Sequence, residues 1–343
     1  MKACVRVAAR ELALQEMPEP TALPGSIVVK PTLCTICGTD IHLLELPIPG
    51  ITMGHEAVGT VHEIGEGVTG LNVGDRVVWS CLTTCGICYQ CLNGQLSACS
   101  GAGSMQMFGI FVQGLQAELA VVPHANFNVA KIPDELTDEQ VLFASDIMST
   151  GFGVVERGNL KVGDTIAIFA QGPLGLCATA AAKTLGAGLI IGVESVPERI
   201  AMSKKMGASV VLNPKEVADI PAEVRAMTGG IGVDVAIEAV GTEATIDAAT
   251  RSCRKGGTVS SLGVYSTPTW PVPIDLDFYH RQHNTTLCPP GKDRLRRLMD
   301  LVKYHRIDLT PLWTHRVPFS DIIDAYKMFQ ERRDGCIKIA INM

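Results

Sequence analysis

Short apolar runs alternate with helical segments from residue 165 onward, and this alternation limits the fold more than any other feature of the sequence. The expected strands are Thr165–Ala170, Leu189–Val193, Val233–Glu238 and Thr258–Leu262, and the expected helices among them are Leu174–Leu185 and Pro197–Met206. Such alternation predicts a parallel sheet with helices on both faces. We therefore expect an α/β fold with a doubly wound, nucleotide-binding sheet.

The rest of the chain has a different character. Its first part holds short apolar strands between Gly and Pro turns, at Ile27–Lys30, Ala57–Val61 and Asp75–Trp79. Two amphipathic helices and a terminal strand come near the end, at Arg294–Tyr304, Ser320–Arg332 and Ile337–Ile341. A length of 343 residues fits two domains. The sequence predicts that residues 150–287 form one domain, inserted into a β-rich domain made of residues 1–149 and 288–343.

Charge and cysteine content narrow the possible partners and compartment. The net charge of −6 gives no reason to expect nucleic acid or an anionic membrane as a partner. Lys2, Arg6 and Arg10 break up any N-terminal signal region. Polar residues and glycines interrupt the apolar run 166–182, which falls short of the ~20 residues of a membrane span. Twelve cysteines without a secretion signal favour the reducing cytoplasm.

Four cysteines lie in one short stretch with the spacing C-x2-C-x2-C-x7-C, at Cys85, Cys88, Cys91 and Cys99. Zinc prefers such thiolate ligands in a tetrahedron, with sulfur at about 2.3 Å. Two disulfides or four unrelated buried thiols are the alternatives, but cysteines this dense without a secretion signal favour a metal. Because four protein ligands close the coordination shell, we expect this zinc to be structural.

A glycine-containing turn lies between the first strand and the first helix of the alternating region. Residues 170–175 read AQGPLG, which differs from the dinucleotide fingerprint G-x-G-x-x-G by having Ala170 at the first glycine. The helix that follows presents free N–H groups to a pyrophosphate. We expect Gly172, Pro173, Leu174 and Gly175 to contact the cofactor.

An acidic residue, Glu194, ends the next strand, nineteen residues after Gly175. A carboxylate at this place accepts hydrogen bonds from ribose hydroxyls and repels a 2′-phosphate. Ser195 and Val196 follow it, with no arginine to bind a phosphate. We therefore predict NAD rather than NADP, with Glu194 and Ser195 in the cofactor site. A solvated carboxylate at the strand end is the alternative.

A sparser set of possible metal ligands includes Cys37 and His55. Three protein ligands and one open position form the usual catalytic zinc site. Asp146 is the leading choice for the third ligand, because an unpaired carboxylate among its apolar neighbours would be unfavourable. An inert core thiol at Cys37 and a helix cap at Asp146 remain open alternatives.

Taken together, these motifs resemble the zinc-dependent medium-chain alcohol dehydrogenases along essentially the whole chain. The shared features are Cys37-x2-Asp40, Gly54-His55-Glu56, residues 73–77, the four cysteines, and the turn 170–175 followed by Glu194. Residues 146–152 and 287–289 are most similar to the bacterial secondary-alcohol dehydrogenases. The resemblance implies a GroES-like catalytic domain (1–149 and 288–343) and a Rossmann domain (150–287).

The resemblance also implies a ligand set. Cys37, His55 and Asp146 would bind a catalytic zinc, so that each chain would hold two zinc ions. Asp40 would fix the ring of His55. Glu56 would be a nearby carboxylate that can enter the zinc's coordination shell.

Further roles are implied around the cofactor. Thr39 and His42 would pass the alcohol proton, through the cofactor ribose, to solvent. Thr150 would touch the nicotinamide and Lys338 the pyrophosphate. The expected reaction is reversible hydride transfer between NAD and a secondary alcohol or ketone. The resemblance favours a homo-oligomer, a tetramer over a dimer.

Other activities share this scaffold. Polyol, L-threonine and formaldehyde dehydrogenases are alternatives of the same class. A zinc-free quinone reductase or a catalytically silent structural relative is an alternative from another class. Retention of the four residues Cys37, His55, Glu56 and Asp146 argues against the last two. Many relatives that have Asp as the third zinc ligand lack the four cysteines and prefer NADP. This chain departs from them, because it has the four cysteines and Glu194. An uncharged substrate is favoured by the apolar pocket candidates Met105, Met107, Phe108, Leu287 and Cys288.

Overall fold

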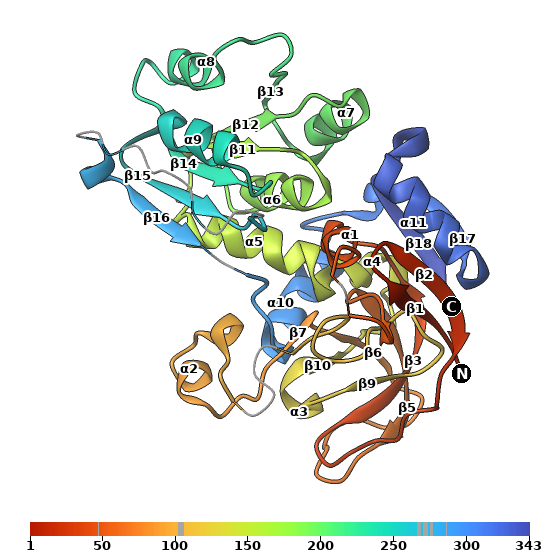
Figure 1. Ribbon diagram of the computed structural model, residues 1–343. Helices are drawn as coiled ribbons and strands as arrows, with labels where there is room; N and C mark the ends of the chain where they lie inside the picture. Colours follow the sequence, from red (N-terminus) through yellow and green to blue (C-terminus); the bar gives the residue numbers. More distant parts are fainter. Residues whose placement is uncertain (47, 102–105, 266–268, 270–273, 275–276, 286) are drawn as a thin grey trace. The chain divides into compact units, whose positions relative to one another are not determined.

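The computed structural model describes residues 1–46, 48–101, 106–265, 269, 274, 277–285 and 287–343 (Figure 1). The chain forms two compact units. The first unit is Met1–Ser149 together with Cys288–Met343, and the second unit is Thr150–Leu287. Helix α5 (Ile147–Arg157) contains the chain boundary between them.

The second unit is built on a parallel sheet. Its strands are β11 (Thr165–Phe169), β12 (Leu189–Val193), β13 (Val210–Leu212), β14 (Val233–Glu238), β15 (Cys253–Ser261) and β16 (Gln282–Thr285). Its helices are α6 (Pro173–Thr184), α7 (Pro197–Met206), α8 (Ile220–Met227) and α9 (Glu243–Ser252). The strand order is β13-β12-β11-β14-β15-β16, and neighbouring strands are parallel.

This strand order confirms the doubly wound sheet. The chain moves outward from β11 to β13 and then returns to β14 on the other side of β11. Right-handed crossovers therefore place α6 and α7 on one face and α9 on the other. In agreement, α6 packs on α7 and α8 packs on α9. The order reverses between β11 and β14, and in such sheets ligands bind beyond the carboxyl ends of the strands at this point.

The first unit is rich in short strands. They are β1 (Lys2–Ala8), β2 (Glu11–Glu16), β3 (Ile27–Cys34), β4 (Ile51–Thr52), β5 (Ala57–Ile64), β6 (Arg76–Trp79), β7 (Leu82–Thr83), β8 (Gln106–Met107), β9 (Ala120–Val122), β10 (Val129–Lys131), β17 (Trp313–Pro318) and β18 (Lys338–Asn342). Its helices are α1 (Gly38–Leu43), α2 (Tyr89–Leu92), α3 (Ala125–Asn128), α4 (Asp138–Val141), α10 (Lys292–Lys303) and α11 (Ile322–Glu331).

One mixed sheet joins the two ends of the chain in the first unit. Its order is β10-β6-β5-β3-β18-β17, and β9 also pairs with β3. Strand β18 runs antiparallel to β3 and parallel to β17. A continuous core that includes the buried side chains of Trp79, Phe108 and Tyr326 lies against it. The sheet therefore brings residues near the C-terminus beside those that follow β3.

The expected segments largely coincide with the observed ones, and β12, α7 and β14 have the bounds read from the sequence. The main difference is β15, which begins at Cys253 rather than Thr258. Its first residues contain Gly256 and Gly257, which break the apolar pattern, yet Cys253 pairs with Val233 across a register shift.

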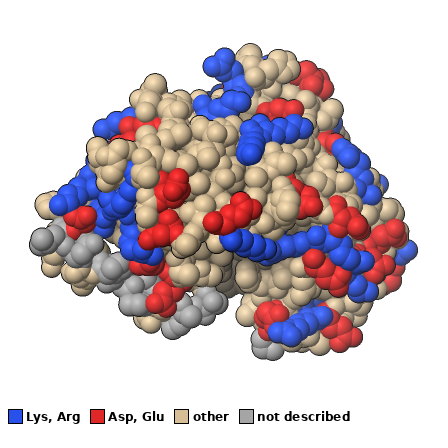
Figure 2. Space-filling model, turned by 90° about the horizontal axis from the view of Figure 1, so that it is seen from above, with Lys and Arg blue, Asp and Glu red and all other residues tan. Residues whose placement is uncertain are grey.

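In Figure 2, Lys and Arg side chains are interspersed with Asp and Glu over the visible face. Within the described residues, the helices are all too short or too polar to cross a bilayer.

Candidate metal and cofactor sites

The four cysteines converge around a single point. The Sγ–Sγ distances are 3.5 Å for Cys88–Cys91, 3.9 Å for Cys88–Cys99 and 3.6 Å for Cys85–Cys99. Four sulfurs placed tetrahedrally at about 2.3 Å from one ion would lie about 3.8 Å apart. The separations are much longer than a disulfide bond of about 2.05 Å. Residues 85–99, named here the four-cysteine lobe, therefore fit one zinc ion.

The thiols of this lobe differ in how readily they form the thiolate that binds a cation. Hydrogen bonds from the backbone of Cys91 and Ser100 lower the pKa of Cys88 to about 5. Burial raises the pKa of Cys91 to about 12. Since the thiolate is the form that binds metal, Cys88 is ready at neutral pH, whereas Cys91 must lose its proton on binding.

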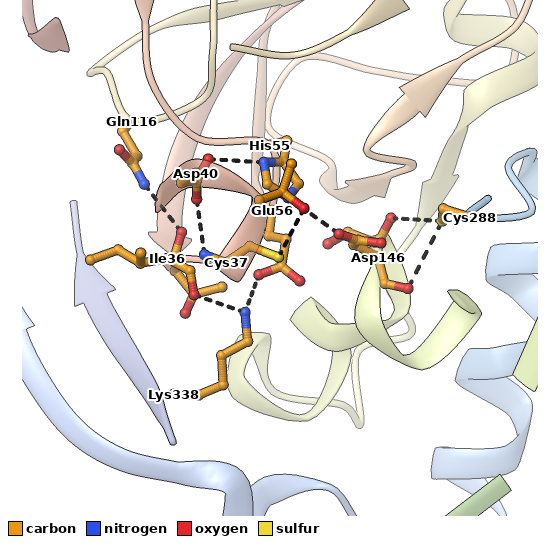
Figure 3. A network of polar contacts seen from close by, with 12 residues as sticks. Ile36, Cys37, Asp40, His55, Glu56, Gln116, Asp146, Cys288 and Lys338 are labelled. Atoms are coloured by element: carbon orange, nitrogen blue, oxygen red, sulfur yellow. Dashed lines mark hydrogen bonds and ion pairs between the residues drawn. The ribbon is translucent and has the colours of Figure 1, made fainter. Parts of the chain in front are cut away.

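A second donor group gathers Cys37, His55 and Asp146 in the first unit. One ligand atom from each lies within 4.8 Å of the others. Cys37 precedes α1, His55 lies between β4 and β5, and Asp146 immediately precedes α5. Figure 3 shows the three side chains pointing toward one another from these separate segments.

Asp40 orients two members of this group. Its Oδ1 lies 3.0 Å from His55 Nδ1, and its Oδ2 accepts a hydrogen bond of 2.9 Å from the Cys37 backbone N–H. The carboxylate is completely buried. Because the Nδ1 position is engaged, Nε2 is the nitrogen left to face Cys37 and Asp146, which is the usual way a buried carboxylate orients a metal-binding histidine.

Gly54 permits the approach of His55 to the site. Its φ of +87° lies in the left-handed region, where a Cβ is strained. A Cβ there would also lie 2.5 Å from the Gln116 side chain. Gln116 is itself held by a hydrogen bond of 2.8 Å from the Tyr326 hydroxyl. The glycine before His55 is therefore required by both conformation and space.

The donor chemistry fits a divalent cation. His55 Nε2 is 3.2 Å from Asp146 Oδ2 and, among the described residues, lacks a partner with hydrogen-bond geometry. Burial lowers the pKa of His55, but Asp40, with added contacts to Asp146 and Cys37, raises it well above its ordinary value. A cation that binds Nε2 would take the place of the proton that these anions stabilise.

Glu56 and Lys338 form a buried ion pair beside this group. Lys338 Nζ contacts Glu56 Oε2 and donates a hydrogen bond of 3.0 Å to the Ile36 carbonyl. Both side chains are fully buried. Glu56 Oε1 has no hydrogen-bond partner in the part of the chain that the structure describes. Burial raises the pKa of Glu56, although Lys338 opposes this effect.

The expected contact of Lys338 with the cofactor stays a prediction. The resemblance implied a contact with a cofactor pyrophosphate, but the ammonium is fully buried and engaged by Glu56 and Ile36. A buried carboxylate needs a nearby opposite charge more than a solvated phosphate does. In this structure Lys338 is the counter-charge of the buried Glu56 carboxylate.

The two residues expected in a proton relay lie on α1. Thr39 is partly exposed, and its hydroxyl oxygen is 3.8 Å from Cys37 Sγ. His42 is exposed on the same helix. The helix thus carries Thr39 beside the metal-ligand group and His42 at the surface.

The turn between β11 and α6 has the geometry of a phosphate-binding loop. Ala170 adopts a φ of +75°, the conformation that the missing first glycine would supply. A Cβ on Gly175 would lie 2.0 Å from the Ala170 carbonyl oxygen, so only glycine permits this packing of helix on strand. The nearest atom to a Cβ on Gly172 is Arg199 Nη1, at 3.7 Å, which leaves the backbone there open to a ligand. Pro173 and Leu174 form the first turn of α6.

Glu194 is held by backbone groups rather than solvated. Its Oε1 accepts hydrogen bonds from the N–H groups of Ser195 (2.7 Å) and Val196 (3.0 Å). Its Oε2 accepts one from Gln171 (3.0 Å). A carboxylate has about four acceptor positions, so Oε2 keeps room for a ribose hydroxyl.

Sequence reasoning missed Arg199. Its Nη1 lies 4.0 Å from Glu194 Oε2 and beside Gly172. The sequence signal was available, because Arg199 is in the first turn of α7, which returns it toward the end of β12. The cofactor site therefore contains both an acidic and a basic side chain.

The remaining residues expected at the cofactor or in the substrate pocket differ in burial and lie in both units. Thr150 is buried on α5 in the second unit. Phe108 is fully buried in the core of the first unit, and Met107 packs against Cys288. Leu287 is 45% exposed in the second unit. Met105 lies outside the described residues.

Two family models match the chain. Residues 23–134 match the alcohol dehydrogenase GroES-like domain, and residues 173–303 match the zinc-binding dehydrogenase model. The first match confirms the expected GroES-like fold for that region.

Individual relatives cover nearly the whole chain. It is 43% identical to an alcohol dehydrogenase from Cupriavidus necator, across 99% of this chain and 98% of the relative. It is 32% identical to an NADP-dependent isopropanol dehydrogenase from Thermoanaerobacter brockii, across 94% of each. Among solved structures, an alcohol dehydrogenase from Thermus sp. ATN1 superposes with a TM-score of 0.92 at 32% identity, covering 100% of this chain and 99% of that one.

Proposed function

Because this chain belongs to the zinc-dependent medium-chain alcohol dehydrogenases, we propose that it transfers hydride reversibly between a secondary alcohol or ketone and NAD. Oxidoreduction of an alcohol follows from the family itself. The observation that carries the proposal is the convergence of Cys37, His55 and Asp146 within 4.8 Å, with Asp40 fixing the histidine ring.

In this proposal Cys37, His55 and Asp146 hold the catalytic zinc, and the four-cysteine lobe holds a structural one. The catalytic zinc would act as a Lewis acid that polarises the alcohol oxygen and makes its proton easier to remove. Three protein ligands leave one position for substrate, whereas four thiolates leave none. Glu56, whose buried Oε1 has no hydrogen-bond partner among the described residues, is the additional carboxylate that can approach the metal.

Thr39 and His42 would move the proton. The Thr39 hydroxyl lies beside Cys37, where it can accept a hydrogen bond from the substrate hydroxyl. His42 lies exposed on the same helix and can exchange a proton with solvent near neutral pH. Thr39 would act because its hydroxyl lies where the substrate proton leaves, and His42 would act because it can bind and release a proton.

Cofactor choice rests on Glu194 and Arg199. The free acceptor position of Glu194 supports a ribose hydroxyl and therefore NAD. Arg199, 4.0 Å away, offsets part of the negative charge that would repel a 2′-phosphate. We infer a preference for NAD that is not absolute. In this site Gly172, Pro173, Leu174, Gly175 and Ser195 would contact the cofactor, and Thr150 its nicotinamide.

Assembly and compartment complete the proposal. The exposed apolar side chains Ile87, Tyr89 and Leu92 on the four-cysteine lobe, each at least 75% exposed, support burial in a homo-oligomer, with a tetramer favoured over a dimer. The cytoplasm is the proposed location, because the two metal groups need reduced thiols.

One experiment tests the activity and the ligand set together. Purified protein is assayed with a panel of secondary alcohols, primary alcohols and polyols using NAD or NADP, and its zinc is counted after dialysis. We expect the highest kcat/KM with a secondary alcohol and NAD, and two zinc ions per chain. Asp146→Ala should retain one zinc and lose turnover, whereas Asp134→Ala, which removes an exposed carboxylate, should retain both. Full zinc occupancy in Asp146→Ala would refute the ligand set, and a preference for NADP would refute the cofactor assignment.

A further inference from the structure

A third group of possible metal donors lies beside the proposed zinc site. The Sγ atoms of Cys81 and Cys288 and a carboxylate oxygen of Asp146 lie within 4.8 Å of one another. All three residues are buried, with exposed fractions of 2%, 6% and 9%. We propose that Cys81, Cys288 and Asp146 form a second site for a thiophilic divalent cation, which shares Asp146 with the site of Cys37 and His55. This inference rests on the proposed function, which assigns Asp146 to the catalytic zinc site.

The two thiols are held against the turn that carries Asp146. The Cys81 backbone N–H donates a hydrogen bond of 2.9 Å to the Ser145 carbonyl. Cys288 Sγ lies 4.0 Å from the Ser145 carbonyl oxygen and 3.9 Å from that of Asp146. Figure 3 shows Asp146 between His55 on one side and Cys288 on the other. Three segments far apart in sequence therefore converge on one carboxylate.

The segment of Cys288 is anchored independently of the thiol. Ser149 Oγ donates a hydrogen bond of 2.7 Å to the carbonyl of Pro289, the residue after Cys288. The Gly291 backbone N–H donates one of 3.0 Å to Ser80 Oγ, next to Cys81. These contacts fix the backbone on both sides of the pair, so that small side-chain rotations suffice to bring the donors around an ion.

The donor types select the ion. Two thiolates and one carboxylate suit Zn²⁺ or Cd²⁺, whereas Mg²⁺ and Ca²⁺ prefer oxygen ligands. Sulfur ligands at about 2.3 Å and an oxygen ligand at about 2.1 Å would require donor separations near 3.6–3.8 Å. The observed limit of 4.8 Å is within reach of that geometry.

Charge balance permits either one or two divalent ions to bind in this region. With one divalent ion, the charges of Cys37 and Asp146 neutralise it, and Cys81 and Cys288 remain uncharged thiols. With two divalent ions, the four anionic donors of the two groups carry four negative charges against four positive ones. Glu56 and Lys338 already neutralise each other. A second ion that binds together with two newly formed thiolates therefore leaves the net charge of this buried region unchanged.

Inert packing is the competing interpretation, because buried cysteines commonly behave as small apolar side chains. Cys81 and Cys288 do pack with Leu82. Their convergence on a carboxylate distinguishes them from a thiol such as Cys253, which is buried in the second unit and belongs to no donor group found among the described residues. A second ion beside the shared Asp146 would inhibit alcohol turnover, so excess zinc or cadmium should act as a reversible inhibitor.

The test counts ions rather than turnover. Full-length protein is stripped of metal under reducing conditions, titrated with Cd²⁺, freed of unbound ion, and analysed for cadmium per chain and for the ultraviolet absorption of cadmium thiolates. We expect three ions in the wild type, one for each donor group, and two in Cys81→Ala. Cys253→Ala should bind three. If Cys81→Ala does not fold, Cys288→Ala carries the same expectation.

Two outcomes overturn the proposal: only two ions in the wild type, or three in the Cys81 and Cys288 variants. Alcohol-dependent NADH formation is measured separately on wild-type protein loaded with two equivalents of zinc. Turnover without a third cadmium site would leave the dehydrogenase proposal intact and remove this one. A third cadmium site without alcohol turnover would support this inference and contradict the dehydrogenase proposal.

Discussion

Ala170 adopts a backbone conformation that glycine occupies far more readily. Its φ of +75° follows from the tight turn that leads β11 into α6. A left-handed conformation of a residue with a Cβ is unfavourable by roughly 1–2 kcal/mol. Ala170→Gly relieves this strain but gains chain entropy in the unfolded state. We expect a net stabilisation of up to about 1 kcal/mol, measured by the shift in the thermal midpoint. Ala178→Gly, in the buried interior of α6, is the matched control and should destabilise the protein.

Lys338 provides a second prediction at the scale of single residues. Lys338→Met removes the counter-charge of a fully buried Glu56. Loss of one partner of a buried ion pair costs about 3–5 kcal/mol of stability. The double variant Lys338→Met with Glu56→Gln should recover much of the loss in denaturant unfolding. An unchanged stability with a raised KM for the cofactor would instead support the pyrophosphate role.

Side-chain partners are also where sequence reasoning was weakest. Cys37, His55 and Asp146 could be proposed as a group because residue type and spacing restrict them. The contact of Lys338 with Glu56 was not foreseen, because a sequence does not reveal which buried carboxylate a lysine meets. Arg199 was missed, although its place in the first turn of α7, shortly after Glu194 in the sequence, was a signal for the contact between them.

Three strands of the second unit are linked at one edge by Asp234 on β14. Its carboxylate accepts hydrogen bonds from the Thr165 backbone N–H (2.7 Å) and hydroxyl (2.8 Å) on β11 and from Arg254 Nε (2.7 Å) on β15. Burial raises the pKa of Asp234, but these hydrogen bonds lower it below the ordinary value. The ionised form is therefore stabilised by folding.

Because folding stabilises the ionised form of Asp234, the stability of the protein should depend on pH. A lowered folded-state pKa contributes stability above the unfolded-state pKa of 3.8, and this contribution is lost as pH falls through the folded-state value. Asp234→Asn should lose about 1–3 kcal/mol at pH 7, and its difference from the wild type should shrink below about pH 4. Asp247→Asn, which breaks only an exposed pair with Arg251, should change little at any pH. Unfolding midpoints measured between pH 7 and 3 decide this, and a constant difference would contradict it.

Elements with a strong pattern were predicted closely, and weakly patterned ones were not. Strands β12 and β14 are continuous apolar runs, as buried parallel strands should be. The short helices α2 and α3 hold only four residues each, too few to show a helical period. Strand β2 has no fully buried residue, and only Leu12 and Leu14 of its residues pack against the core, which is too short a pattern to mark a half-buried strand.

The two proposed zinc sites should differ in what they contribute to the whole molecule. Cys88→Ser removes one ligand from the four-cysteine lobe, in which the sulfurs lie 3.5–3.9 Å apart. Because binding energy at a structural site contributes to folding, we expect the thermal midpoint to fall by at least about 5 °C. The folded fraction should keep its kcat. Cys37→Ser should show the opposite pattern, with turnover lost and a smaller change in thermal midpoint. Equal effects on activity would contradict the division of roles.

The pairing of β18 with β3 has a consequence for how the protein is made. Synthesis proceeds from the N-terminus, so Glu56 leaves the ribosome long before Lys338 does. The second unit is continuous in sequence and can fold as soon as it emerges. The first unit must wait for residues 288–343, and until then its buried carboxylate has no counter-ion. A nascent chain stalled before Lys338 would therefore carry a folded nucleotide-binding unit and a metal site that is still unfinished.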